Sequence, residues 1–273
     1  MRQDPLFPEW QPSGTASEER LSELRAFDEL GHLARRYRES RTFGELLDFV
    51  IKMHELSPYN AALLHLQKPG AQMVRTAAEW LLLGRQPLPE AQPALLLYPG
   101  GPLRFVFDVG DTEGKPISLP PARPPAPDLA KLLTNTVERI SREGVEVVGP
   151  LFEQEPRGRL RRGRKGESPF TITLETGHAP AAQYATLVYE LARLFLGQLG
   201  GCEGCDWPAR SPADEISGRF EAGAVAAIVC GRAGIPTEAA AFVRGYLKNF
   251  TEVPDLSLDL VLRAAGRIER LGR

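Results

Sequence analysis

The sequence predicts an α+β fold that is rich in helix. A small antiparallel sheet is expected in the N-terminal half, and a helical domain with a short sheet in the C-terminal half. Apolar residues recur at helical spacing through most of the 273-residue chain. Two compact apolar runs, 94–98 and 103–109, flank a Pro-Gly-Gly-Pro connection and indicate paired strands. Short β-rich segments at 145–148 and 169–174 indicate the second sheet.

The N-terminal helices are predicted from polar N-cap residues that precede apolar residues at helical spacing. Residues 1–16 are rich in Pro, Gly and Ser, and we expect them to form a flexible lead-in. The expected helices begin near Ser17, Thr42, Ser57 and Thr76.

A proline-rich segment separates the two halves. Residues 116–127 contain six prolines, which is typical of a linker. We therefore expect a first α+β domain over residues 17–115 and a second domain over residues 128–273.

The second half alternates short strands with helices before it becomes entirely helical. Its expected elements, in order, are a helix near 127–142, a strand at 145–148, a polar and basic loop at 153–167, a strand at 169–174, a helix at 180–199, a loop at 200–212, and helices near 214–232, 237–249 and 256–271.

The helix at 180–199 carries a pattern that resembles a zinc-peptidase motif without its zinc ligands. In His-Glu-x-x-His, the two histidines share one helical face and bind Zn²⁺, and the glutamate activates a water. Here the glutamate is Glu190, but the histidine positions hold Tyr189 and Arg193. Arg193 adds a permanent positive charge where the cation would lie. The pattern therefore predicts no catalytic residue, no metal and no cofactor.

The surrounding residues resemble the ImmA/IrrE family of zinc metallopeptidase-like proteins. The similarity lies in residues 186–200, around Glu190, and in a later helix at Glu221-Ala222 and Val225-Ala226. It implies a zincin-like domain of gluzincin type, with Glu190 at the general-base position and Glu221 at the third-ligand position. The departures at Tyr189 and Arg193 affect the positions that carry the chemistry, so the resemblance implies a pseudoenzyme.

We expect Arg193 to replace the cation by pairing with Glu221, and also with Glu190. A guanidinium group suits carboxylates, and a buried acid without a metal carries a large desolvation penalty. The alternative is that Arg193 is simply solvated at the helix surface.

The first half resembles the N-terminal domain of ArdC-type antirestriction proteins, which binds single-stranded DNA. The similarity covers roughly residues 40–120. It includes Asn60, Gln67, Trp80 and Arg85. Single-strand binders combine basic grooves with aromatic platforms, which Arg75 and Tyr59 also fit. The alternative is that Trp80 belongs to the core and Asn60 caps a turn.

The densest basic run lies in the second half. It holds six positive charges within nine residues, 157–165. Phosphate contacts from such a loop would be independent of sequence and sensitive to salt, although charge runs are also typical of solvated loops. The candidate nucleic-acid-binding residues are thus Tyr59, Asn60, Gln67, Arg75, Trp80, Arg85, Arg157, Arg159, Arg161, Arg162, Arg164 and Lys165.

Composition limits the classes of partner. The net charge of −2 gives no global attraction to nucleic acid, so such binding must come from a local patch. No run is long and apolar enough to span a bilayer, and the N-terminus lacks the apolar core of a signal peptide. Three cysteines form no disulfide framework, and the Cys202 and Cys205 pair has no matching second pair. We therefore expect a cytoplasmic protein without a membrane partner.

These observations predict a catalytically inactive, metallopeptidase-like protein. Its expected partner is single-stranded DNA or another polyanion, or a regulatory protein. The alternative is an active zinc metallo-endopeptidase of ImmA/IrrE type that uses atypical ligands.

Overall fold

The computed structural model divides into two compact units, Met1–Arg36 and Tyr37–Arg273. All the residues that it describes belong to the second unit. They are 37–97, 103–121, 126–149, 158–163, 168–175, 177–201, 207–210 and 212–273. The predicted lead-in at 1–16, the helix from Ser17 and the Pro-Gly-Gly-Pro connection therefore lie outside the described residues.

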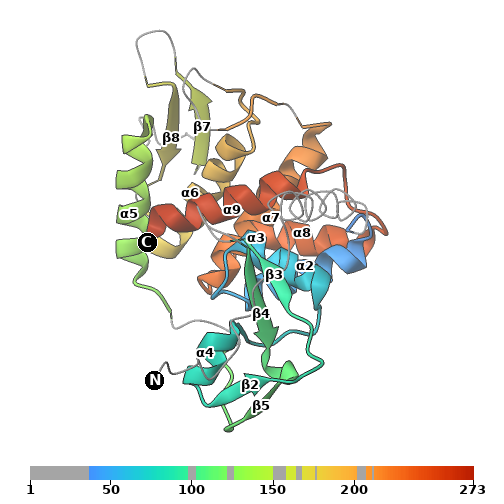
Figure 1. Ribbon diagram of the computed structural model, residues 1–273. Coiled ribbons are helices and arrows are strands. Elements are labelled where there is room, and N and C mark those ends of the chain that lie inside the picture. Colours follow the sequence, from blue (N-terminus) through green and yellow to red (C-terminus); the bar gives the residue numbers. More distant parts are fainter. Residues whose placement is uncertain are drawn as a thin grey trace, which may run out of the picture. The chain divides into compact units, whose positions relative to one another are not determined.

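The described part is an α+β fold in which helices dominate, as the sequence predicts (Figure 1). Several helices begin at the expected N-caps: Ser57 accepts from the Asn60 N–H, and Thr76 forms a capping box with Glu79. The helices are α2 (Ser40–Lys52), α3 (Pro58–Gln67), α4 (Ala77–Leu82), α5 (Leu129–Arg142), α6 (Pro180–Phe195), α7 (Glu215–Arg232), α8 (Glu238–Asn249) and α9 (Leu258–Gly272).

Small antiparallel sheets lie in the N-terminal half, as expected. Strands β1 (Val74–Arg75), β4 (Arg104–Asp108) and β3 (Ala94–Leu96) pair in that order. The predicted pairing of 94–98 with 103–109 is thus confirmed, with Ala94 opposite Val106. Strands β2 (Arg85–Pro87) and β5 (Thr112–Gly114) form a second, two-stranded sheet that the sequence did not predict.

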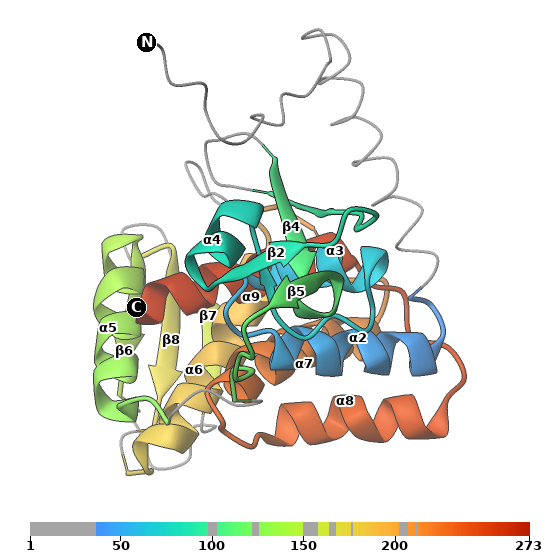
Figure 2. The ribbon, with the colours of Figure 1, turned by 60° about the horizontal axis from the view of Figure 1, so that its bottom comes forward.

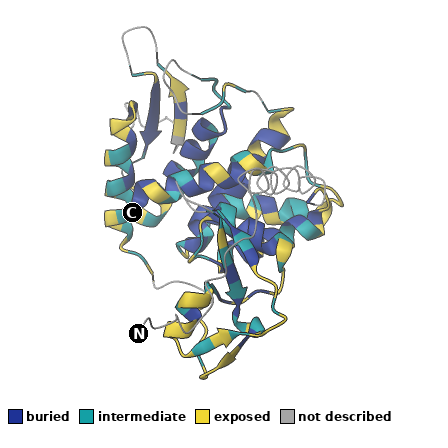
Figure 3. Ribbon diagram, in the orientation of Figure 1, coloured by how far each residue is buried: buried dark blue, intermediate teal, exposed yellow. Residues whose placement is uncertain are grey.

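The sheet of the C-terminal half is mixed. Its central strand β8 (Phe170–Leu174) pairs in parallel with β6 (Val145–Val148) and antiparallel with β7 (Gly158–Arg162). All five residues of β8 are buried (Figure 3). Strand β7 corrects the sequence prediction, because residues 158–162 were expected in a loop. The segment has one apolar residue among arginines, so its sequence gives no clear strand pattern. It forms a strand because it pairs with the buried strand β8.

Helix α7 forms the centre of the core. It is buried along most of its length and packs against α2, α6, α8 and α9 (Figure 2). Its small residues permit this close packing. A Cβ atom on Gly223 would lie 2.8 Å from Val243 Cγ2, so the approach of α8 depends on a glycine there.

Residues from both predicted domains share this core. Phe43 of α2 packs on Phe220 of α7, with ring centroids 5.5 Å apart. The end of α7 is tied to the end of α2 by Arg232, whose side chain is 4% exposed. Its guanidinium donates to the carbonyl oxygens of Val50, Met53 and Leu56 at 2.9–3.0 Å. Thus α2 and α7 form one packed unit, whereas the domain limits at 115 and 128 remain a prediction.

Two amide side chains of α3 close the free edge of strand β3. Asn60 donates through Nδ2 to the Leu97 carbonyl at 2.8 Å and accepts from the Leu97 N–H at 2.9 Å. Gln67 makes the same pair of bonds with Leu95, at 2.9 and 2.8 Å. An unpaired strand edge is a template for aggregation, so these amides take the place of a neighbouring strand.

The Asn60→Ala substitution is expected to lower the free energy of unfolding by about 1–2 kcal/mol, because both polar groups of Leu97 lose their partner. Urea denaturation measures this loss. The matched control is Gln86→Ala, since Gln86 also offers an amide but bonds only to the exposed Glu113. Equal stability of the two variants would contradict the edge-closing role.

Candidate functional site

The residues that the sequence aligns with the His-Glu-x-x-His pattern lie on α6 beside strand β7. Glu190 is 5% exposed. Its Oε2 accepts from the Leu160 N–H at 3.1 Å and from Arg193 Nη1 at 2.9 Å. The carboxylate therefore bonds to the backbone of the outer strand and to the arginine one helical turn along.

Glu221 of α7 is 0% exposed, and its partners come from two other segments. Arg210 Nη1 donates to both carboxylate oxygens, at 2.9 and 3.0 Å. The Ser257 N–H donates to Oε1 at 2.8 Å and thereby ties the start of α9 to α7. The buried charge is thus neutralised and fully hydrogen-bonded, which a buried carboxylate requires.

The expected pair between Arg193 and Glu221 is therefore wrong in its partner: Arg193 pairs with Glu190, and Arg210 takes the place beside Glu221. The position of the segment that carries Arg210 leaves one trace in the sequence. This is the glycine at position 197, where φ is +76°. A Cβ atom there would lie 2.0 Å from the Pro208 carbonyl oxygen, so a glycine is needed where this segment crosses the end of α6.

Tyr189 is partly buried beside these charges. Burial raises the pKa of its phenol, and the positive charges of Arg193 and Arg219 act in the opposite direction. The phenol is thus neutral at physiological pH.

The described residues do not fit a zinc ion at this place. A zinc site needs three or four ligands, mainly His or Cys. Glu190 is already paired with Arg193, and Glu221 is already paired with Arg210. Within the described ranges, no group of three or more His, Cys, Asp or Glu side chains is arranged to hold a metal ion. Cys202 and Cys205 lie outside those ranges.

Strand β7 carries the described part of the basic run. Arg159, Arg161 and Arg162 are exposed, whereas Leu160 between them is buried. Arg159 and Arg161 alternate with Leu160, so they lie on the opposite sheet face. Arg162 donates to the Gly201 carbonyl at 3.0 Å. The remaining candidates, Arg157, Arg164 and Lys165, lie outside the described residues.

The candidates of the N-terminal half are mostly engaged within the fold. Besides Asn60 and Gln67, Trp80 is 0% exposed and donates to the Phe107 carbonyl at 2.9 Å. Its indole therefore has no exposed face for a base, which agrees with the core alternative. Arg85 donates to Thr112 and Lys115 and so holds β2 against β5.

The other two candidates also have protein partners. Tyr59 packs beside Arg263 of α9, whose guanidinium lies 5.8 Å from the ring centroid. Burial, followed by the charge of Asp259, raises the pKa of the Tyr59 phenol. Arg75 pairs with Glu55 at 2.8 Å.

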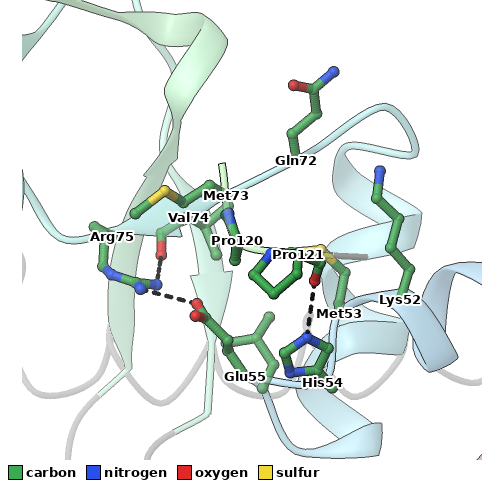
Figure 4. A pocket seen from close by; sticks show the side chains of 11 residues that line it. Lys52, Met53, His54, Glu55, Gln72, Met73, Val74, Arg75, Pro120 and Pro121 are labelled. Atoms are coloured by element: carbon green, nitrogen blue, oxygen red, sulfur yellow. Dashed lines mark hydrogen bonds and ion pairs between the residues drawn. The ribbon is translucent and has the colours of Figure 1, made fainter. Parts of the chain in front are cut away.

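Arg75 and Glu55 also line a pocket between the end of α2, strand β1 and two prolines (Figure 4). There His54 Nε2 lies 3.2 Å from the Pro121 carbonyl oxygen. These contacts fasten the proline-rich segment to α2, which gives the pocket a structural role.

Sequence reasoning missed Arg232, a buried polar residue with several partners. Besides its three carbonyl partners, Arg232 pairs with Glu269 of α9 at 3.1 Å. Burial lowers the pKa of this guanidinium, and Glu269 counteracts that effect. Its neighbour Cys230 is fully buried, which raises the pKa of the thiol to about 12 and leaves it unreactive.

No protein-family model and no curated protein match this sequence. The solved structures that are similar to it include two of one protein. Both are of the antirestriction protein ArdC from the R388 plasmid, one bound to Mn(II) and one metal-free. Each is 17% identical and covers 78% of this chain and 81% of that chain, with TM-scores of 0.37 and 0.34. In the described residues, no helix is long and apolar enough to cross a membrane.

Proposed function

We propose that this protein binds single-stranded nucleic acid and that its peptidase-like helices serve as a non-catalytic scaffold. The observation that carries the proposal is which charged side chains around α6 are paired and which are exposed. Arginines neutralise both carboxylates of the former metal site, while Arg159 and Arg161 are exposed on the neighbouring strand. A site that would attract a cation is replaced by a surface that attracts polyanions.

Fluorescence anisotropy with a labelled single strand of about 20 nucleotides tests the proposal. We expect affinity to fall strongly between about 50 and 200 mM salt. The double substitution Arg159→Ala and Arg161→Ala should weaken binding and reduce the salt slope by about 0.7 for each lost phosphate contact. The control is Arg142→Ala, which removes an exposed arginine from α5. Salt-independent or absent binding would contradict the proposal.

An active metallo-endopeptidase with atypical ligands is the rival function. Metal analysis of protein purified without added zinc separates the two. Stoichiometric metal would overturn the proposal, because the arginine pairs of Glu190 and Glu221 would have to open.

A regulatory protein partner is favoured by one surface feature. At the end of α4, Leu81, Leu82 and Leu83 are 48%, 88% and 42% exposed. Consecutive exposed leucines are typical of a contact surface. Failure of every single strand to bind, with affinity for a partner that Leu82→Asp abolishes, would favour this function.

A further inference from the structure

A line of alternating cationic and aromatic side chains crosses helices α6, α7 and α8. Tyr189 and Arg193 lie one turn apart on α6, and both Arg193 and Arg219 of α7 influence the phenol electrostatically. The Arg219 guanidinium lies 4.0 Å from the ring centroid of Phe242 on α8. Helix α7 packs against both α6 and α8, so the three helices that carry these residues lie together although they are far apart in sequence (Figure 2).

The line continues along α8 as a series of rings spaced four residues apart. The ring centroids of Phe242 and Tyr246 are 6.5 Å apart. Tyr246 and Phe250 are stacked, at 4.4 Å and 24°. We call the six side chains Arg193, Tyr189, Arg219, Phe242, Tyr246 and Phe250 the α6–α8 strip.

An aromatic ring and two cationic side chains of the strip are exposed to solvent and therefore accessible to a ligand. Phe250 is 55% exposed, which is unusual for a phenylalanine that has an aromatic neighbour to pack on. The Arg193 side chain is 33% exposed, and Arg219 and Lys248 are exposed. Among the described residues, neither Arg219 nor Lys248 has a carboxylate partner.

This combination suits one class of ligand. Single-stranded nucleic acids present bases that stack on aromatic rings and phosphates that pair with cations. Base pairs of a duplex are already stacked and cannot use such rings in this way. An acidic peptide would use the arginines but would leave the exposed Phe250 without a partner.

We propose that the α6–α8 strip is a binding surface for single-stranded nucleic acid, with a base stacked on Phe250 and phosphates held by Arg219 and Arg193. This inference rests on the proposed function and adds a site to it, distinct from the basic strand β7. The strip starts at Arg193, so one of the former zinc-ligand positions becomes part of the polyanion surface.

Phe250→Leu and Arg219→Gln test the inference, with two labelled probes of about 20 nucleotides: oligothymidine and an abasic strand of equal length. Leucine keeps the apolar packing on Tyr246 but removes the ring. Phe250→Leu should weaken oligothymidine binding about fivefold or more and leave abasic binding almost unchanged. Arg219→Gln should weaken both probes and reduce the salt slope by about 0.7.

The matched controls are Leu119→Ala, which alters an exposed apolar side chain outside the strip, and Arg142→Gln on α5. If the unchanged protein binds and the β7 double variant weakens binding, but Phe250→Leu and Arg219→Gln behave like these controls, the strip is not a binding surface and the proposed function still stands. If the unchanged protein binds neither probe, the proposed function fails and the inference fails with it.

Discussion

Replacing Arg232 with alanine is expected to lower the free energy of unfolding by at least about 3 kcal/mol. The guanidinium is 4% exposed and satisfies the carbonyl oxygens of Val50, Met53 and Leu56 together with the carboxylate of Glu269. Its removal leaves buried acceptors without a donor, and the Glu269 carboxylate, which is 13% exposed, keeps only the more distant Arg273 at 3.8 Å as a charge partner. Urea denaturation followed by tryptophan fluorescence measures the loss.

Two variants show whether the effect comes from this buried network. Arg244→Ala is the control, because Arg244 and its partner Asp48 are 55% and 62% exposed, and it should cost under about 1 kcal/mol. Arg232→Lys keeps the charge but cannot reach acceptors in three directions, so we expect an intermediate loss. Similar stabilities for Arg232→Ala and Arg244→Ala would contradict this account.

Replacing Arg210 with alanine is expected to cost about 3 kcal/mol or more. Glu221 has no exposed surface, and without Arg210 its only remaining partner among the described residues is the Ser257 N–H. Adding Glu221→Gln to the Arg210→Ala variant should recover part of this loss. The glutamine is neutral, and its amide oxygen can still accept from Ser257.

The matched comparison is Arg193→Ala, which breaks the other arginine–glutamate pair. The Arg193 side chain is 33% exposed, and Glu190 keeps its bond from the Leu160 N–H, so the expected loss is only about 1–2 kcal/mol. Denaturation curves of the two alanine variants measure these two losses of free energy of unfolding. A larger loss for Arg193→Ala than for Arg210→Ala would show that the stability of this region depends more on the Arg193–Glu190 pair.

The helices and the longer apolar strands followed from local sequence signals. The N-caps at Ser57, Thr76, Asp214 and Thr237 begin helices because each side chain satisfies an N–H that the helix leaves free. The strand at Val145–Val148 was predicted with the bounds that it has in the structure. These features depend on residues close together in the chain, so a reading along the sequence can find them.

The candidate site was predicted less well, because its geometry depends on distant residues. The sequence placed Glu190 and Glu221 in consecutive helices and led us to expect Arg193 as the partner of Glu221, whereas Arg210 takes that place in the structure. Likewise, the sequence alone makes Asn60 and Trp80 candidates for ligand binding. In the folded protein Asn60 hydrogen-bonds to the chain at the open edge of strand β3, and Trp80 is buried in the core.

The sequence by itself therefore determined the α+β class and most helix limits. Only the tertiary structure decided which arginine neutralises which buried acid, that residues 158–162 form a strand, and that Arg219 of α7 lies over the Phe242 ring of α8. The physical reason is the same in each case. Hydrogen bonding within a helix is local, whereas ion pairs, sheet edges and stacked rings depend on which segments the hydrophobic core brings together.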